Sequence, residues 1–291
     1  MHKKFLSVIF AAALVFLTIA ANPAQAERRA DHVFIISFDG GKPAVIKQSH
    51  MPNFMKMAGE GATTWVANTI MPSITLVSHT SMLTGVSPAK HKILWNEWEP
   101  DKGIVQVPTV FQVAYKEKLS TAMFVGKPKF IHLYRAQSLS RFSYPAYECG
   151  TVASIAASYI IDKKPNLCFV HFADSDGAGH QYGWGSEQQK KAFAEEDAAL
   201  GVVMNAIDKA GIADSSVVIL TADHGGHDRT HGTDSPDDMN IPWVAWGKGV
   251  KRGDKITAPV TTYDTSATAL WLLGVPVPEH FDGKPVTSAF R

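Results

Sequence analysis

An apolar run leads into a loop rich in ionisable side chains in the segment Ser216-Val217-Val218-Ile219-Leu220-Thr221-Ala222-Asp223-His224-Gly225-Gly226-His227-Asp228-Arg229-Thr230-His231. Residues 216–220 predict a buried strand, because they are apolar and mostly β-branched. The eleven residues from Thr221 to His231 then hold two carboxylates and three imidazoles. Zn²⁺ accepts such oxygen and nitrogen ligands, and Mn²⁺ can accept them too. These residues alone leave a metal site and an ordinary surface loop both open.

The rest of the chain alternates short strand-like runs with helix-length segments. Besides residues 216–220, apolar runs predict strands at residues 32–38, 121–125, 167–172 and 242–246. The segments between them predict helices at residues 52–59, 75–83, 107–118, 151–161, 187–210 and 262–273. Strands separated by helices indicate an α/β fold, in which a mostly parallel central sheet carries helices on both faces.

The first 26 residues have the pattern of a secretory signal peptide. Lys3 and Lys4 form a positive start, residues 5–21 are apolar, and Ala24-Gln25-Ala26 is a cleavage site of small residues. An uncleaved anchor is the alternative, although an apolar run of about 17 residues is marginal for spanning a bilayer. We therefore expect cleavage before Glu27, followed by export to the periplasm or the exterior without stable membrane insertion.

Charge and cysteine content narrow the function further. The chain has 28 basic and 27 acidic residues, and two of the basic ones lie in the first 26 residues, so the remainder carries a formal charge of −1. That balance argues against coating nucleic acid or binding a membrane through a basic surface.

The two cysteines are Cys149 and Cys168. A disulfide in an exported protein and a free buried thiol are both open.

Three Asp residues follow predicted strands. Asp39 comes after residues 32–38, Asp176 after residues 167–172, and Asp223 after residues 216–220. Ligands of open α/β sheets bind beyond the carboxyl ends of the strands, so these carboxylates should converge. His180 follows Asp176 by four residues in a Gly-rich loop, and the segment quoted first supplies further imidazoles. Such a set could hold two metals, and paired metals suit displacement at phosphorus.

A candidate nucleophile lies in the hydroxyl-rich residues 71–85, which are predicted to open a helix. A helix N-terminus favours negative charge, so a hydroxyl there is well placed to meet a phosphate and to ionise on a metal. Spacing alone does not choose among Ser73, Thr75 and Ser78. Ser73 or Thr75 could equally be a simple N-cap.

From residue 33 to about residue 249, the chain resembles the alkaline phosphatase superfamily, in particular its type I phosphodiesterase/nucleotide pyrophosphatase branch. The resemblance is carried, in chain order, by Asp39-Gly40, Thr75-Leu76-Val77-Ser78-His79, Thr84-Gly85, His91-Lys92-Ile93, Asp176-Gly177-Ala178-Gly179-His180, Asp223-His224-Gly225 and His231-Gly232. It implies an alkaline-phosphatase-like fold. The 265 residues after the signal-like segment are enough for one large α/β domain, so we expect a single catalytic domain over residues 27–291.

The resemblance also implies the role of each site residue. It implies two divalent metal ions, zinc or manganese, and Asn96 would hold a phosphoryl oxygen. His227 is a rival of His231, and the His-Gly context favours His231. One metal would bind Asp176, His180 and His231, and the other would bind Asp39, Asp223, His224 and the nucleophile Thr75.

The resemblance implies a phosphodiesterase or nucleotide pyrophosphatase that acts on a small phosphoester, and the signal-like first 26 residues imply that it is exported. Leu76 replaces an aromatic residue that can stack on a base in nucleotide-cleaving relatives, which puts a nucleotide preference in doubt. The alternatives are a phosphomonoesterase, a phosphonoacetate-hydrolase-like C–P hydrolase and, outside enzymes, an exported metal- or phosphate-binding protein. Trp95, Trp98, Tyr182 and Trp184 could line the pocket or simply pack.

Overall fold

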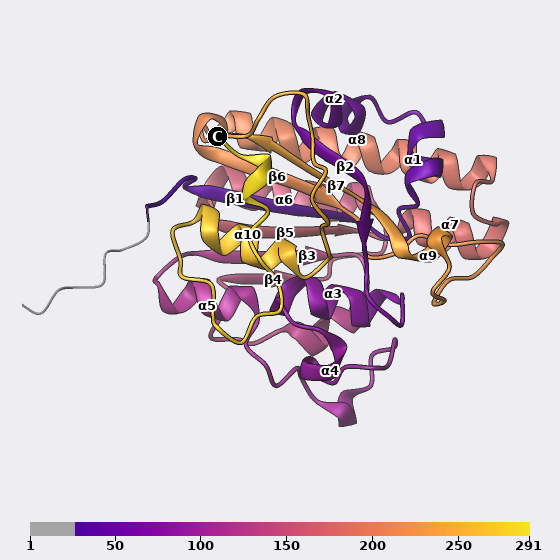
Figure 1. Ribbon diagram of the computed structural model, residues 1–291, viewed down its shortest axis with the longest axis horizontal. Helices are drawn as coiled ribbons and strands as arrows, with labels where there is room; N and C mark the ends of the chain where they lie inside the picture. Colours follow the sequence, from indigo (N-terminus) through magenta and orange to yellow (C-terminus); the bar gives the residue numbers. More distant parts are fainter. Residues whose placement is uncertain (1–26) are drawn as a thin grey trace, which may run out of the picture.

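The computed structural model describes residues 27–291, so the predicted signal peptide lies outside the described residues. One eight-stranded sheet, in the order β4-β3-β5-β1-β6-β7-β2-β8, runs through the molecule (Figure 1). The strands are β1 (His32–Phe38), β2 (Ala62–Asn68), β3 (Thr121–Val125), β4 (Arg141–Ser143), β5 (Leu167–Phe172), β6 (Ser216–Thr221), β7 (Asn240–Gly247) and β8 (Asp254–Lys255).

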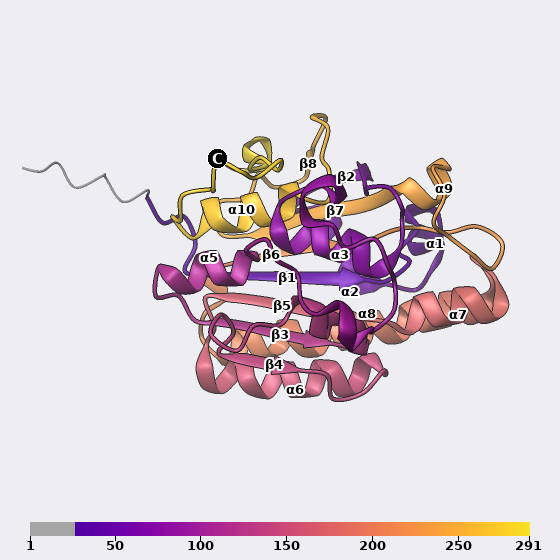
Figure 2. The same ribbon diagram turned by 90° about the horizontal axis from the view of Figure 1, so that it is seen from below.

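Helices cover both faces of this sheet, as Figure 2 shows. The α-helices are α1 (Pro43–Gln48), α2 (Pro52–Glu60), α3 (Thr75–Thr84), α4 (Pro88–His91), α5 (Val110–Lys116), α6 (Cys149–Lys163), α7 (Asp174–Tyr182), α8 (Glu187–Lys209), α9 (Pro236–Met239) and α10 (Asp264–Leu272). Four 3₁₀ helices complete the described elements: η1 (Pro100–Lys102), η2 (Pro128–Leu133), η3 (Ala213–Ser215) and η4 (Thr287–Ala289). The α/β fold with a mostly parallel sheet is confirmed, because β7 alone runs antiparallel to its neighbours β6 and β2.

The central strands are apolar on both sides because each side faces a separate core. Val33 and Ile35 of β1 point to the core formed with α3, α5 and α10. Phe34, Ile36 and Phe38 point to the core formed with α1, α2, α6 and α8. Side chains alternate across a strand, so a strand covered on both faces reads as one continuous apolar run.

The register of the sheet brings the carboxyl ends of three strands together. β1 lies between β5 and β6, with Phe38 opposite Phe172 and Ser37 opposite Thr221. The chain therefore leaves β1, β5 and β6 at one edge of the sheet. Phe38 is fully buried there, with its ring centroid 5.3 Å from that of Phe54 and 5.6 Å from that of Phe172. This packing fixes the strand end from which the site begins.

Several short elements, among them β4, β8, α1, α4 and α9, were not predicted, and three further departures are informative. α5 begins at Val110 rather than at residue 107, because Thr109 and Gln112 form a capping box that starts the helix. β2 was not predicted, and it pairs with β7 through an irregular register. The Gly-rich loop predicted around Asp176 is wrong, because that segment is helix α7.

Helix α7 contains glycines because neighbouring side chains lie against its backbone. A Cβ on Gly177 would lie 2.3 Å from the Tyr147 hydroxyl oxygen, and one on Gly179 would lie within 3.0 Å of the Trp184 ring. Glycine costs a helix about 1 kcal/mol relative to alanine. Here that cost is offset by close packing and by Asp174 and Asp176 in the first turn, where the helix dipole favours negative charge.

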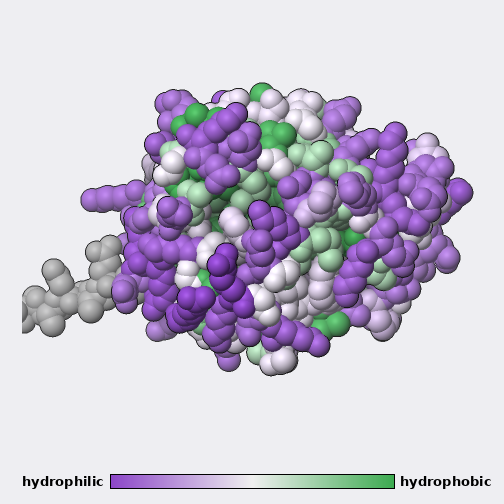
Figure 3. All heavy atoms as spheres, turned by 90° about the horizontal axis from the view of Figure 1, so that it is seen from above, coloured by the Kyte–Doolittle hydropathy of each residue, from purple (hydrophilic) through white to green (hydrophobic). Residues whose placement is uncertain are grey.

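The face drawn in Figure 3 is mostly hydrophilic, with hydrophobic residues in small separate areas. Within residues 27–291, no helix combines the length and the apolar character that crossing a membrane requires.

Cys149 and Cys168 are both free and buried, so the structure has the thiol alternative rather than the disulfide. Burial raises the pKa of both thiols.

Candidate metal centre

Three of the predicted ligands form an inner group at the carboxyl ends of β1 and β6. Asp39 directly follows β1, while Asp223 and His224 lie two and three residues beyond β6. His224 Nε2 lies 3.4 Å from Asp39 Oδ1 and 3.2 Å from Asp223 Oδ2. All three residues are fully buried. We call this set the inner group.

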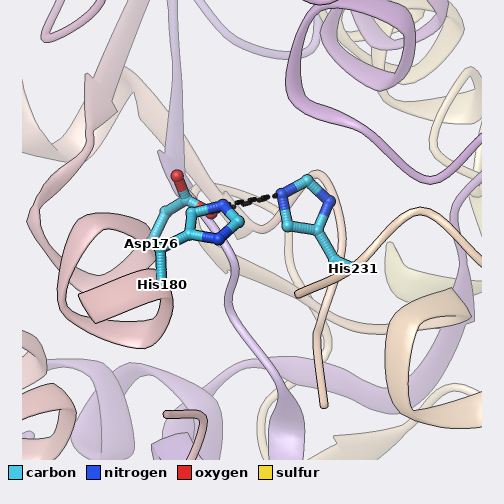
Figure 4. A group of neighbouring side chains, drawn as sticks. All are labelled: Asp176, His180 and His231. Atoms are coloured by element: carbon cyan, nitrogen blue, oxygen red, sulfur yellow. Dashed lines mark hydrogen bonds and ion pairs between the residues drawn. The ribbon is translucent and has the colours of Figure 1, made fainter. Parts of the chain in front are cut away.

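The other three predicted ligands form an outer group (Figure 4). Asp176 and His180 lie four residues apart on α7, which places them on one face of the helix. His231 approaches from the loop after β6, and its Nε2 lies 3.1 Å from His180 Nε2 and 3.6 Å from Asp176 Oδ1. The Asp176 carboxylate is buried, whereas the His180 side chain is 45% exposed. We call this set the outer group.

Backbone carbonyls set the tautomers of the three imidazoles in these groups. His224 Nδ1 donates to the Gly225 carbonyl over 2.8 Å. His180 Nδ1 donates to Arg229 over 3.0 Å, and His231 Nδ1 donates to Ser73 over 2.9 Å. A carbonyl oxygen only accepts, so the proton of each neutral ring lies on Nδ1. In its neutral form each ring therefore turns an Nε2 lone pair towards its group, which is the arrangement a metal-binding histidine needs.

Both groups contain polar atoms that suit a cation. Asp176 Oδ1 and Asp223 Oδ2 are buried and lack a hydrogen-bond partner within residues 27–291. In each group, one ligand atom from every member lies within 4.8 Å of the others. The lone pairs of His180 and His231 also face each other, which is unfavourable without positive charge between them. The residues present therefore fit a divalent cation in each group.

The pKa values of the inner group are shifted by burial and by charged neighbours. Burial and the neighbouring Asp39 carboxylate raise the pKa of Asp223 to about 8. Burial opposes charge on His224, but the carboxylates of Asp223 and Asp39 outweigh it and raise its pKa to about 9. Burial also opposes charge on Asp39, yet Lys127, His171 and His224 hold its pKa well below the usual value. Burial thus penalises the charged form of every member, and the charge of each depends on oppositely charged neighbours.

Thr75 is the first residue of α3, and it lies against the inner group. Its Oγ1 is 3.4 Å from Asp39 Oδ1 and 3.4 Å from His224 Nε2. The residue is only 1% exposed. The other two hydroxyl candidates lie elsewhere, because Ser73 donates to the Thr233 carbonyl and Ser78 accepts from Thr69. Of the three, Thr75 alone is hydrogen-bonded to members of the inner group.

A cleft of about 350 Å³ opens over the outer group and Thr75. Asn96 lies on its wall, and its Oδ1 accepts from the Leu76 amide over 2.9 Å. This bond leaves the Asn96 NH₂ as a donor. A larger hollow of about 830 Å³ runs along β2 and β8, but its lining includes no member of either group. The smaller cleft is therefore the one lined by Thr75 and by the outer group.

Several residues at or beside this cleft were not singled out from the sequence. Lys127 Nζ lies 2.6 Å from Asp39 Oδ2 and 2.6 Å from Asp176 Oδ2. Lys129 and Tyr147 also line the cleft. His171 donates from Nε2 to Asp39 Oδ2 over 2.8 Å, while its Nδ1 accepts from the Gly126 amide. A histidine inside the apolar run of β5 was a signal for His171, whereas the lysines carried no comparable mark.

The predicted aromatic and histidine alternatives have structural contacts. Trp184 Nε1 donates to the Gly40 carbonyl over 3.0 Å, and a Cβ on Gly226 would lie 2.2 Å from its ring. Trp95 donates to His132. His227, the rival of His231, hydrogen-bonds Asp238 over 2.8 Å and belongs to neither group. His79 and His91 had no predicted ligand role, and they hydrogen-bond Ser37 and Ser81, respectively. Trp98 packs on His132, and Tyr182 is exposed.

Sequence comparisons agree with the motifs. The family described as type I phosphodiesterase / nucleotide pyrophosphatase matches residues 33–241. The rat ectonucleotide pyrophosphatase/phosphodiesterase family member 7 is 21% identical over 243 residues, which cover 75% of this chain and 55% of that protein. The chain spans about half the length of the curated relatives it first matches.

Structural comparisons agree with the fold. Murine ectonucleotide pyrophosphatase/phosphodiesterase 5, in an inactive form bound to AMP, superposes with a TM-score of 0.76 at 13% identity, covering 91% of this chain and 100% of that one. A chain from Bacteroides thetaiotaomicron that is described as a sulfatase superposes with a TM-score of 0.75 at 16% identity, covering 90% and 75%. At these identities the likeness concerns the fold.

Proposed function

Because the chain belongs to the type I phosphodiesterase / nucleotide pyrophosphatase family, we propose that it is an exported metal-dependent phosphoester hydrolase with Thr75 as its nucleophile. The observation that carries this proposal is the position of the Thr75 hydroxyl. It lies at a helix N-terminus, 3.4 Å from two ligand atoms of the inner group, and it lines the same cleft as the outer group. A nucleophile between two cation sites suits displacement at phosphorus.

The two groups would each hold one divalent cation, zinc or manganese. The inner group, with Thr75 Oγ1, would hold the first, and the outer group would hold the second. Bound there, such cations would supply Lewis-acid charge and lower the pKa of a hydroxyl. The oxygen and nitrogen ligands, the Nε2 lone pairs and the unpartnered carboxylate oxygens support this assignment.

The chain's own residues then perform the displacement. Thr75 Oγ1 gives up its proton to solvent and forms a bond to phosphorus, while the bond from phosphorus to the leaving oxygen breaks and that oxygen takes up a proton from water. The Asn96 NH₂ donates to a non-bridging oxygen and holds the phosphoryl group in line. Water then displaces Thr75 from the phosphothreonine intermediate and releases phosphate or a phosphomonoester. Burial of Thr75 excludes water during the first displacement.

The substrate we favour is a small phosphodiester or nucleotide pyrophosphate. Relatives named as nucleotide pyrophosphatases and the AMP-bound structure of one neighbour support a nucleotide-like substrate. Leu76 is fully buried in α3, so it offers no exposed face for a base. A preference for diesters therefore rests on the family more than on a base-binding surface.

The remaining features of the proposal concern organisation and location. Residues 27–291 would form one catalytic domain, since one sheet carries both groups. The signal-like pattern of the first 26 residues supports export to the periplasm or the exterior. The partner is then a small molecule rather than nucleic acid or membrane.

A substrate panel tests this proposal. The chain is loaded with zinc or manganese and assayed with bis(p-nitrophenyl) phosphate, p-nitrophenyl phosphate and phosphonoacetate. We expect the diester to have the highest kcat/KM. A preference for the monoester or for phosphonoacetate would support a phosphomonoesterase or a C–P hydrolase instead. No turnover of any compound by metal-loaded protein would overturn the proposal in favour of a binding protein.

A further inference from the structure

The buried Lys127 ammonium forms an ion pair with one carboxylate of each group. Its ammonium lies 2.6 Å from Asp39 Oδ2, in the inner group, and 2.6 Å from Asp176 Oδ2, in the outer group. The Lys127 side chain is only 9% exposed. Neither the sequence motifs nor the proposed mechanism gives this residue a role.

The two carboxylates divide their oxygens between Lys127 and their ligand groups. Asp39 Oδ1 faces Thr75 and His224, while Oδ2 faces Lys127. Asp176 Oδ1 faces the imidazoles of the outer group, while Oδ2 faces Lys127. The ammonium therefore leaves the cation-facing oxygens free. It neutralises the carboxylates without occupying either candidate site.

The charge around Lys127 explains why it is needed before a metal binds. Asp39 and Asp176 place two carboxylates in a buried space. An uncompensated buried charge is strongly destabilising, and Lys127 supplies positive charge to both of them.

We propose that Lys127 is a built-in counter-cation that stabilises the metal-free site and opposes metal binding in both groups. The proposal rests on the metal assignment of the proposed function. A fixed positive charge beside a cation site repels the incoming ion, and this repulsion is large at a buried position. The site thus remains folded without metal, at the expense of weaker metal binding.

The opposite effect is the main competitor. Outer partners of metal ligands orient them, and their loss commonly weakens metal affinity about 10–100-fold. Here, Asp39 Oδ2 keeps a second partner in His171 when Lys127 is removed. Asp176 is fixed in the first turn of α7 and is buried. We therefore expect the effect of charge to exceed the effect of orientation.

The test compares Lys127→Met, Lys127→Gln and Lys127→Arg in the full mature chain. Calorimetric titration of metal-free protein with zinc should show at least about tenfold tighter binding for the Met and Gln variants, and little change for Arg. Thermal unfolding should show the metal-free Met variant melting about 10 °C below the unchanged protein. Excess zinc should remove most of that difference, because the metals then neutralise the carboxylates.

Lys129→Met is the matched control. Lys129 is equally buried on the same segment, but its ammonium reaches Glu97 at 3.5 Å rather than a carboxylate of either group. Its removal should change zinc affinity less than removal of Lys127. Unchanged or weaker zinc binding by Lys127→Met and Lys127→Gln would overturn this inference alone. Failure of the unchanged protein to bind any divalent cation would overturn the metal assignment as well.

Discussion

The inner and outer groups contain the same types of ligand in opposite surroundings. The members of the inner group follow two paired strands, β1 and β6, and all of them are fully buried. The outer group joins one helix, α7, to a loop, and its His180 side chain is 45% exposed at the cleft. Hydrogen bonds of the sheet thus fix the first group, whereas packing of a helix and a loop fixes the second.

This difference indicates a division of labour in the proposed reaction. Thr75 contacts the inner group, where burial protects an ionised hydroxyl from competing water. The outer group lines the open cleft, where a leaving group can depart. A rigid site for the nucleophile and an accessible site for exchange are what a two-step displacement requires.

Thr75→Ala should reduce turnover at least about 10³-fold, because it removes the attacking oxygen. Both groups keep all their carboxylates and imidazoles, so zinc content should stay near that of the unchanged protein. Steady-state rates and elemental analysis on one preparation measure both quantities. Thr75→Ser is the matched control and should retain part of the rate. Substantial activity in the Ala variant would remove Thr75 from the mechanism.

Asp223→Ala should eliminate metal binding by the inner group while the outer group still binds. Asp223 Oδ1 accepts from the Gly40 amide, whereas the buried Oδ2 has no hydrogen-bond partner in the described chain and is free to bind a cation. We expect zinc content to fall by about one ion per chain, and turnover to fall with it. Elemental analysis measures the loss. Retention of both ions would show that Asp223 is not a ligand.

His180→Ala should weaken metal binding by the outer group with little effect on folding. The side chain is half-exposed on the surface of α7, so its removal should change unfolding free energy by less than about 0.5–1 kcal/mol. Activity should be lost at low zinc and partly recovered at high zinc. Zinc titrations followed by activity and by calorimetry test this. Loss of inner-group binding in this variant would contradict the separation of the two groups.

His227→Asn should have the smallest effect and should depend on pH. The hydrogen bond to Asp238 raises the pKa of His227 above its ordinary value of 6.5. The charged pair therefore stabilises the fold fully below pH 6.5, and this contribution is lost as pH rises through the raised value. The variant should melt about 1–3 °C lower at pH 5.5 and closer to the unchanged protein at pH 9. An equal difference at both pH values would contradict this linkage.

The sequence was most informative where one residue type served one local purpose. The apolar runs of β1, β5 and β6 predicted strands at nearly the observed bounds, because a strand covered on both faces must be apolar throughout. Asp39 and Asp223 followed as residues at strand ends, and their meeting is a consequence of parallel pairing. The resemblance then separated His231 from His227, which spacing could not do.

The sequence was least informative where a residue's role depends on distant neighbours. Lys127 is one of 28 basic residues, and only the fold shows that it lies between two carboxylates. Helix α7 was read as a loop because its glycines are poor helix formers. They are tolerated because Tyr147 and Trp184 pack against the places where side chains would stand. Such tertiary compensation has no local signature.

The indole of Trp184 touches both halves of the centre at once. It donates to the carbonyl beside Asp39, packs against the glycine beside His180, and has its ring centroid 5.2 Å from that imidazole and 5.8 Å from that of His231. Indole emission responds to nearby charge and to quenching by imidazole. Trp184 is one of seven tryptophans, so the emission difference between the unchanged protein and Trp184→Phe would report on the proposed metal loading without an added dye.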